Sequence, residues 1–376
     1  MNKLRDVKSV HIFPKAKIKS LRRALLAHYD ARRRELPWRI RPEARASGIT
    51  PDPYAIWLSE IMLQQTTVAH GTPYWYAFLE KFPTVMNLAN AERDFVLTMW
   101  AGLGYYARAR NLHRCAQMIR DEFGGAFPQS EAELLKLPGI GPYTAATMAA
   151  ICFDEVTNIV DGNVERVISR IFAVETPLPK GRKDIWTCAK SLAVPEGIKV
   201  TRPGDYGQAL MDLGGRICTP KSPKCGECPW QADCSAFKSG NPETYPRKLK
   251  KAQLAVRHGA GFVLYNKGRV LLERRPDKGL LGGMLGLPVT PWGDKPTSEV
   301  VQSAAPIARN WQLCDNGVKH VFTHFELRLS VYKAEVGEHD AAKLEAQGYI
   351  WGQCSALKTY ALPTLMTKVY KASLDT

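Results

Sequence analysis

The sequence predicts an all-α region followed, after a polar linker, by a smaller α+β domain. The length of 376 residues exceeds that of most single domains, and 45% hydrophobic with 23% charged residues is ordinary globular usage. Apolar residues recur at helical spacing through the first two thirds of the chain, whereas strand-like alternation begins only near residue 255. Four cysteines crowd into residues 218–234 near the end of the helical region. These observations together indicate a multidomain protein.

The charge balance favours a polyanionic partner. The formal net charge is +16 and the isoelectric point is near 9.4, and residues 1–45 hold fourteen Lys and Arg against four acidic residues. We define residues 1–20 as a basic N-terminal arm, which is either a solvated tail or a direct phosphate-binding segment. A cleaved transit peptide is a third interpretation. No apolar run approaches the ~20 residues that a membrane-spanning helix needs, so we expect no membrane association.

The first helices follow from apolar spacing and capping signals. Residues 18–34 and 56–68 each have one apolar side and predict helices. Ser130 followed by Glu133 is a capping box that opens a short helix, and the small residues of 145–153 predict another. Residues 21–237 therefore form one all-α region.

The pattern changes after residue 237. Residues 238–257 are basic, polar and punctuated by proline, which is typical of a linker. Residues 258–376 then form the predicted α+β domain. Its expected elements are strands at 260–265 and 269–275 around the hairpin signal Asn266-Lys267-Gly268, an alternating region at 318–336, and a closing helix at 360–374.

The cysteine spacing predicts a metal centre. Cys218, Cys225, Cys228 and Cys234 follow the pattern C-x6-C-x2-C-x5-C, and the other five cysteines are scattered singly. Four thiolates this close can surround one metal site, and the spacing alone leaves zinc and a [4Fe–4S] cluster open. An odd total of nine cysteines in a long chain favours a reducing compartment over a disulfide scaffold.

A glycine hairpin predicts a phosphate site. Gly139 and Gly141 lie in Leu137-Pro138-Gly139-Ile140-Gly141-Pro142-Tyr143, directly before a helix. Such a turn can present backbone N–H groups to a phosphate oxygen at the helix N-terminus. The alternative is a plain helix–turn–helix with glycine caps.

Two carboxyl groups are candidates for acid–base chemistry. Glu60 has Ile56, Trp57 and Leu63 as helical neighbours, and an apolar surrounding raises the pKa of a carboxyl group toward the range of a general acid. Asp161 lies in Val160-Asp161-Gly162-Asn163, ahead of an amphipathic helix. A solvated helix-face residue and an ordinary N-cap are the alternatives for Glu60 and Asp161, respectively.

Taken together, these motifs resemble those of a known family. The run Trp57-Leu58-Ser59-Glu60-Ile61-Met62-Leu63-Gln64-Gln65-Thr66, the glycine hairpin, Val160–Asn163 and the cysteine spacing resemble the helix–hairpin–helix DNA glycosylases, and within them the adenine DNA glycosylases of the MutY type. Leu36-Pro37-Trp38-Arg39, the segment 102–112, Gly279–Gly283 and Tyr360–Thr364 fit the same family. The resemblance covers the chain from about residue 20.

The resemblance implies an activity and roles for individual residues. It implies hydrolytic removal of adenine mispaired with 8-oxoguanine or guanine in duplex DNA, with Glu60 as general acid, Asp161 as the stabilising anion, and Tyr143 and Asn163 orienting them. Bifunctional members of the superfamily carry a lysine just after the hairpin glycines, where its amine attacks the sugar. Tyr143 stands there, so the resemblance implies a monofunctional enzyme.

The resemblance also implies a cofactor and DNA contacts. It implies a [4Fe–4S] cluster on the four cysteines and a MutT (Nudix)-like fold for residues 258–376, without the acidic Nudix helix. The DNA-contacting residues that it implies are Gln65, Thr66, Tyr105, Gly139, Gly141, and the loop Phe322-Thr323-His324, in which Thr323 replaces the family serine.

The sequence is compatible with two other functions. A thymine- or uracil-removing glycosylase of the same fold would normally lack the C-terminal domain, and a non-enzymatic iron–sulfur DNA-binding protein would not need Glu60 together with Asp161. We expect a monomer that binds double-stranded DNA. We also expect a cytoplasmic location, or a nuclear or mitochondrial one if the source is a eukaryote.

Overall fold

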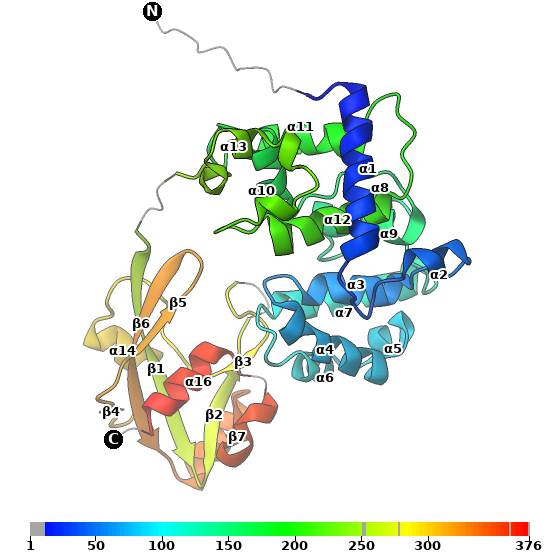
Figure 1. Cartoon of the computed structure of the whole chain (residues 1–376). Coiled ribbons are helices and arrows are strands. Elements are labelled where there is room, and N and C mark those ends of the chain that lie inside the picture. Colours follow the sequence, from blue (N-terminus) through cyan, green and yellow to red (C-terminus); the bar gives the residue numbers. More distant parts are fainter. Residues whose placement is uncertain (1–11, 250–252, 277–278, 361, 375–376) are drawn as a thin grey trace, which may run out of the picture. The chain divides into compact units, whose positions relative to one another are not determined.

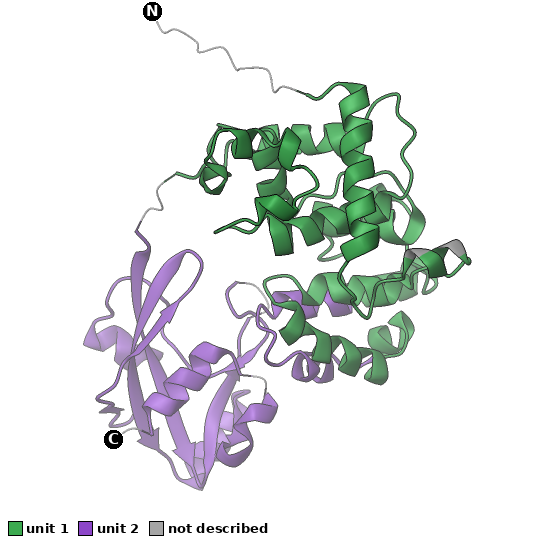
Figure 2. Ribbon diagram, in the orientation of Figure 1, with its two compact units in different colours: residues 1–90, 114–250 green, residues 91–113, 251–376 purple. Residues whose placement is uncertain are grey.

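The computed structural model describes residues 12–249, 253–276, 279–360 and 362–374. It divides into two compact units: residues 1–90 with 114–250, and residues 91–113 with 251–376 (Figure 2). No described helix is both long and apolar enough to cross a bilayer.

The first unit is helical, as the sequence predicts (Figure 1). Its elements are α1 (Lys15–Arg32), α2 (Pro42–Ala46), α3 (Pro53–Met62), α4 (Val68–Lys81), α5 (Val85–Asn90), the later part of α7 (Ala107–Phe123), α8 (Glu131–Leu134), α9 (Pro142–Phe153), α10 (Gly162–Ile171), α11 (Arg182–Ala193), α12 (Pro203–Asp212), the π-helix η1 (Leu213–Ile217), the 3-10 helices η2 (Cys225–Glu227), η3 (Gln231–Asp233) and η4 (Pro242–Thr244), and α13 (Ser235–Lys238).

The helices of this unit pack through small and apolar residues. In α1 the buried Ile18, Leu21 and Leu25 join a core that includes residues of α10, α11 and α12. In α12 a Cβ on Gly204 would lie 2.7 Å from the carbonyl oxygen of Ala150. Only glycine therefore allows α12 to approach α9 this closely.

Two helix boundaries differ from the predictions. Residues 56–68 are not one helix, because α3 ends at Met62 and α4 begins at Val68. Gln65 adopts a left-handed backbone (φ 60°) and the Thr67 side chain caps α4 by accepting from the His70 N–H, so the chain turns between the two helices. The helix α1 begins at Lys15, inside the segment predicted as arm, and residues 1–11 of that arm lie outside the described residues.

The predicted linker is shorter than residues 238–257. The Leu178 N–H donates to the Arg247 carbonyl oxygen at 2.8 Å, Tyr245 is buried, and the first strand begins at Ala255. Both ends of the predicted linker are therefore packed. The aromatic Tyr245 within a basic, polar run was the signal for this packing.

The second unit contains a mixed sheet with helices on both faces. Its elements are α6 (Arg93–Met99) and the first part of α7, followed by β1 (Ala255–Asn266), β2 (Arg269–Arg274), β3 (Leu285–Gly286), α14 (Ser298–Ala304), β4 (Gln312–Leu313), β5 (Val318–Val321), β6 (Phe325–Glu335), α15 (Glu338–Ala346), β7 (Ile350–Gln353), the 3-10 helix η5 (Cys354–Tyr360) and α16 (Thr364–Ala372).

The sheet order is β3-β2-β1-β6-β4, with β5 also on β6 and β7 also on β2. β1 and β6 are parallel, with Ala255 opposite Phe325, whereas the β1–β2 hairpin is antiparallel, as predicted. Neighbouring residues of β1 point to opposite faces: Val263 joins a core with α16 and Leu264 a core with α15. This confirms the predicted α+β class.

The predicted alternating region at 318–336 is a hairpin rather than one strand. β5 and β6 pair antiparallel, and the Phe322 N–H donates to the Phe325 carbonyl oxygen at 2.9 Å to close the turn. Phe322, Thr323 and His324 form this turn. Alternation continues on both sides of the turn, so periodicity alone did not reveal it.

Candidate active site

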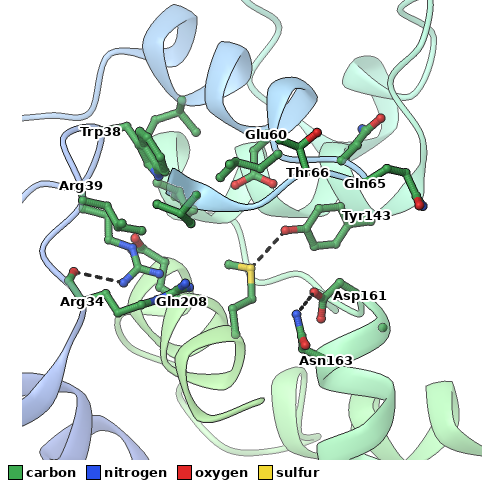
Figure 3. A pocket seen from close by; sticks show the side chains of 18 residues that line it. Arg34, Trp38, Arg39, Glu60, Gln65, Thr66, Tyr143, Asp161, Asn163 and Gln208 are labelled. Carbon is green, nitrogen blue, oxygen red and sulfur yellow. Dashed lines mark hydrogen bonds between the residues drawn. The ribbon is translucent and has the colours of Figure 1, made fainter. Parts of the chain in front are cut away.

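One cavity of the first unit is lined by all four predicted catalytic residues, Glu60, Tyr143, Asp161 and Asn163. It has a volume of about 460 Å³ and is lined by residues from α3, α9, α10, α12, the loop between α1 and α2, and the segment from the end of α3 to the start of α4. Figure 3 shows Glu60 and Asp161 facing this cavity, with the ring of Tyr143 between them in this view. The lining residues are Arg34, Leu36, Trp38, Arg39, Ile56, Glu60, Leu63, Gln64, Gln65, Thr66, Val68, Tyr143, Ile151, Asp161, Gly162, Asn163, Gln208 and Met211.

Glu60 has the pKa of a general acid. It lies in the last turn of α3, whose N-terminus is fixed by the Asp52 side chain accepting from the Tyr54 N–H. Burial raises the pKa of Glu60 from 4.5 to about 7, a hydrogen bond with Tyr143 opposes this rise, and the charge of Asp161 adds to it. The sequence-based expectation of a raised pKa is therefore confirmed.

Tyr143 links the glycine hairpin to the cavity. It is the second residue of α9, directly after Pro142, and its hydroxyl donates to Met211 Sδ at 3.1 Å. A thioether is a weak acceptor, so the same hydroxyl can turn to the Glu60 carboxyl group, with which it also interacts. Burial, followed by the negative charge of Glu60, raises the pKa of Tyr143 well above 10.0 and keeps it protonated as a donor.

Asp161 is both a helix cap and a cavity residue. Its Oδ1 accepts from the Val164 N–H at 2.7 Å, which makes it the N-cap of α10, and its Oδ2 accepts from Asn163 Nδ2 at 2.9 Å. The structural and catalytic interpretations from the sequence therefore do not compete. The cap fixes the carboxyl group at the cavity wall.

The side chain of Asn163 is fixed by Arg166. Arg166 Nη2 donates to Asn163 Oδ1 at 2.9 Å, and the same guanidinium donates to the carbonyl oxygens of Gly214 and Cys218. A Cβ on Gly214 would lie 2.7 Å from Asn163 Cβ, so glycine lets the π-helix η1 approach this residue. The network fixes the Asn163 amide with its N–H toward Asp161.

The hairpin exposes its backbone as the sequence predicts. Gly139 has φ 78° and Gly141 is the N-cap of α9, and both residues are exposed. A Cβ on Gly141 would meet nothing within 4 Å, so the space beside it is open. Pro142 takes the first helical position, which leaves the neighbouring N–H groups at the positive end of the helix dipole.

Sequence reasoning gave no role to the wall formed by Arg34, Trp38, Arg39 and Gln208. Arg39 donates to both carboxylate oxygens of Asp212, at 2.8 and 3.0 Å, and Arg34 pairs with the same carboxylate. Burial opposes ionisation of Asp212, but the hydrogen bond and charge of Arg39 hold its pKa below 3.8. The run Leu36-Pro37-Trp38-Arg39 was the one sequence feature that could have indicated this wall.

The four cysteines line a second pocket of the same unit. Arg170 is buried and donates to Cys218 Sγ at 3.2 Å and to the carbonyl oxygens of Thr219 and Pro220. Trp230 lies within the cysteine loop and donates to the Leu21 carbonyl oxygen, which fastens the loop to α1.

These residues fit a cluster. In a [4Fe–4S] cluster each thiolate binds a different iron, so four cysteines around one pocket, with a cation beside them, suit it.

Two further predicted residues have strained backbones. Gln65 is exposed with φ 60°, and Tyr105 is 58% exposed with φ 48° in the second unit. Arg108 holds the turn before Tyr105 by donating to the carbonyl oxygens of Leu103 and Gly104. Non-glycine residues with positive φ are uncommon and concentrate at functional sites. Thr66 is half-buried at the cavity.

Comparison with known proteins identifies the family. The chain is 32% identical to the adenine DNA glycosylase of Rattus norvegicus over 97% of this chain and 80% of the relative, and 32% identical to that of Homo sapiens over 97% and 76%. The chain belongs to the adenine DNA glycosylase family. It is therefore a base excision repair enzyme, a hydrolase that acts as a DNA N-glycosylase.

Three family models match parts of the chain. Residues 58–186 match the HhH-GPD superfamily of base excision DNA repair proteins, residues 218–234 the iron-sulfur binding domain of endonuclease III, and residues 260–372 the NUDIX domain. The predicted family, the fold class and the [4Fe–4S] cofactor are thereby confirmed.

Among solved structures, a thermostable thymine-DNA glycosylase is similar to this chain. The match has a TM-score of 0.51 and 29% identity, and it covers 60% of this chain and 98% of that protein.

Proposed function

We propose that this enzyme hydrolyses the N-glycosidic bond of adenine mispaired with 8-oxoguanine or guanine and leaves an intact abasic strand. The observation that carries the proposal is the pair Glu60 and Asp161 in one cavity, where the pKa of Glu60 is raised to about 7. A carboxyl group with this pKa is protonated in a large fraction of molecules near neutral pH and can act as an acid. The base must leave the duplex to reach the cavity.

Glu60 protonates the leaving base. Its carboxyl group donates to adenine N7, so the C1′–N9 electron pair departs with a neutral base rather than an anion. Tyr143 keeps its proton and hydrogen-bonds the carboxylate that remains. The ionised Glu60 then activates the water that attacks C1′.

Asp161 stabilises the sugar cation that forms. Its carboxylate faces the cavity and is held by the Val164 N–H and by Asn163 Nδ2, so it needs no rearrangement when positive charge develops at C1′. It can also form a covalent ester with C1′, which water then hydrolyses, as in retaining glycosidases.

The same cavity supports a monofunctional reaction. Strand cleavage through a Schiff base requires an amine, and none of the described residues that line the cavity is a lysine. Tyr143 occupies the position after the hairpin, and a phenol cannot form an imine. The abasic site therefore persists until another agent cleaves it.

DNA is held by the exposed backbone and by strained loops. The N–H groups of Gly139 and Gly141 bind a phosphate. Tyr143, two residues after Gly141, reaches the cavity, so the hairpin can hold the DNA backbone close to the extruded nucleotide. Gln65 and Thr66 fill the space that the adenine leaves, and Tyr105 wedges into the adjacent base step.

The remaining assignments rest on the turn between β5 and β6 and on the cysteine pocket. Phe322, Thr323 and His324 read the 8-oxoguanine, with the hydroxyl of Thr323 replacing that of serine. Cys218, Cys225, Cys228 and Cys234 hold the cluster, which serves folding and DNA docking because hydrolysis transfers no electron. None of the nine cysteines, all of which lie among the described residues, forms a disulfide, and this supports a reducing compartment, which is cytoplasmic or, in a eukaryote, nuclear or mitochondrial. We propose that the enzyme acts as a monomer.

The similarity to a thymine-DNA glycosylase favours one second candidate, removal of thymine from T:G mispairs. Purified protein is incubated with duplexes containing A:8-oxoguanine, A:G, T:G or U:G, and hot alkali then cleaves abasic strands. We expect alkali-dependent cleavage at the adenine in the first two duplexes. Cleavage confined to T:G or U:G would establish the second candidate instead.

A further inference from the structure

A cavity of the second unit has the composition of an anion site. It measures about 280 Å³ and lies between the start of β1, the end of β2 and the segment before Gly293. Its described lining includes two arginines and a tryptophan but no acidic residue. Neither Arg257 nor Arg275 forms an ion pair with any residue that the structure describes.

Aromatic rings fix both guanidinium groups. Arg257 Cζ lies 4.3 Å from the ring centroid of Phe325, and Arg275 Cζ lies 5.3 Å from that of Trp292. Stacking on a ring restrains the plane of a guanidinium but uses none of its N–H donors. Both groups are therefore positioned while their donors stay available.

Two donors in the lining have no acceptor. Arg275 Nε and Trp292 Nε1 are buried and make no hydrogen bond within the described structure. Unpaired buried donors are costly, and each calls for an explanation, of which a bound ion is one. A group rich in acceptor oxygens and negatively charged would match two cations with unused donors.

Backbone hydrogen bonds fix the segments around the cavity. Residues 288–293 run beside β1, with the His258 N–H donating to the Gly293 carbonyl oxygen at 2.7 Å and the Thr290 N–H to that of Ala260 at 2.9 Å. The loop after β2 is closed by the Arg275 N–H donating to the Met284 carbonyl oxygen at 3.0 Å. Trp292 and Arg275 are therefore held in place before any ligand arrives.

The cavity adjoins the predicted lesion-reading turn. The rings of Trp292 and Phe322 lie 5.6 Å apart, and those of Phe322 and Phe325 lie 4.9 Å apart (centroid distances). Trp292 and Phe325, the two rings on which the arginines stack, therefore both contact Phe322, the first residue of the turn Phe322-Thr323-His324. A nucleotide base at this turn would have its own strand's phosphates within reach of the cavity.

We infer that Arg257 and Arg275 bind a backbone phosphate of the DNA strand that carries the 8-oxoguanine. This inference rests on the proposed function only for the identity of that strand. The guanidinium groups supply charged hydrogen bonds to the phosphate oxygens, and Trp292 positions Arg275. The phosphate contact sets the register in which the turn meets the opposite base.

Salt-dependent binding by the full chain tests this inference. Dissociation constants are measured over a range of salt concentrations for a duplex with a non-hydrolysable deoxyadenosine analogue opposite 8-oxoguanine. The double variant Arg257→Gln/Arg275→Gln should bind about tenfold more weakly at low salt. The slope of log K against log[salt] should become shallower by about 0.9 per lost phosphate contact.

Two control variants isolate the contact. Arg257→Lys/Arg275→Lys keeps the charges and should keep most of the wild-type slope. Arg309→Gln removes an arginine whose cation is already paired with Asp340, in the same unit, and should leave the slope unchanged. An unchanged slope in the glutamine double variant, or an equal loss in Arg309→Gln, would overturn the inference.

A further experiment distinguishes binding of a DNA phosphate from binding of a free nucleotide. Quenching of tryptophan fluorescence is measured with deoxyguanosine monophosphate and with deoxyguanosine. Loss of monophosphate binding in the double variant, with an unchanged duplex slope, would show a free-nucleotide site and contradict the DNA assignment. If wild-type protein releases no adenine but the slope still falls, the phosphate site stands and the proposed function fails.

Discussion

Glu60→Gln should strongly slow base release and at the same time stabilise the folded protein at alkaline pH. The wild-type carboxyl group has a pKa near 7 when folded and 4.5 as its ordinary value. Between these values the folded state holds a proton that the unfolded state releases, so wild-type stability falls as pH rises through this window. At about 1.4 kcal/mol per pH unit, this site lowers the free energy of unfolding by about 3 kcal/mol above pH 7.

Glutamine has nearly the same shape but does not titrate. The free energy of unfolding of the wild type should therefore fall by about 3 kcal/mol between pH 4.5 and pH 8 relative to that of Glu60→Gln, because glutamine shows no such loss. Single-turnover adenine release should fall by at least ~10²-fold, the usual effect of losing a general acid. Binding to the A:8-oxoguanine duplex should persist.

Denaturant unfolding at several pH values, together with single-turnover assays, measures both effects. Glu80→Gln, an exposed position on α4, is the matched control and should change neither. A stability difference that does not vary with pH would refute the assigned pKa of Glu60. Wild-type turnover in the variant would refute its role as the acid.

Three further predictions concern the cavity and the second unit. Asp161→Asn should keep α10 capped, because asparagine also accepts at the N-cap, yet lower single-turnover release by about 10²-fold; a wild-type rate would refute its role. Because Tyr143 follows the hairpin where a lysine would be needed, borohydride should trap little covalent enzyme–DNA adduct. Strand breaks that form without alkali would contradict the monofunctional reaction. A chain ending after Lys248, which keeps the buried Tyr245, should still release adenine from A:G but lose most of its preference for 8-oxoguanine over guanine as the opposite base. His324→Ala should show a milder loss of the same preference. If the shortened chain kept its full preference, residues outside the second unit's sheet domain would have to recognise the lesion.

Sequence reasoning succeeded where the signal is local. The raised pKa of Glu60 follows from apolar neighbours three and four residues away on one helix. The exposed hairpin follows from Gly139, which needs a positive φ, and from Pro142 at the first helical position. The cysteine spacing likewise places four thiols in one short loop.

The rest of the cavity depends on contacts between distant segments. Asp212 binds Arg34 and Arg39, which lie more than 170 positions earlier in the chain, and the local sequence around these residues does not predict the contact. The dual position of Asp161, as cap and cavity residue, also required the fold. The end of α3 at Met62 was missed because Val68 follows Ile61 at helical spacing, although the residues between Leu63 and Val68, which include the left-handed Gln65, are all polar.

The pH dependence of adenine release tests the central claim most directly. Free adenine liberated from an A:8-oxoguanine duplex is measured in single turnover between pH 5.5 and pH 9. Because the protonated form of Glu60 is the acid and its pKa is about 7, the rate should be nearly constant below about pH 6 and fall about tenfold per pH unit above about pH 7. A rate that stays constant or rises up to pH 9 would contradict the assignment of Glu60 as the proton donor.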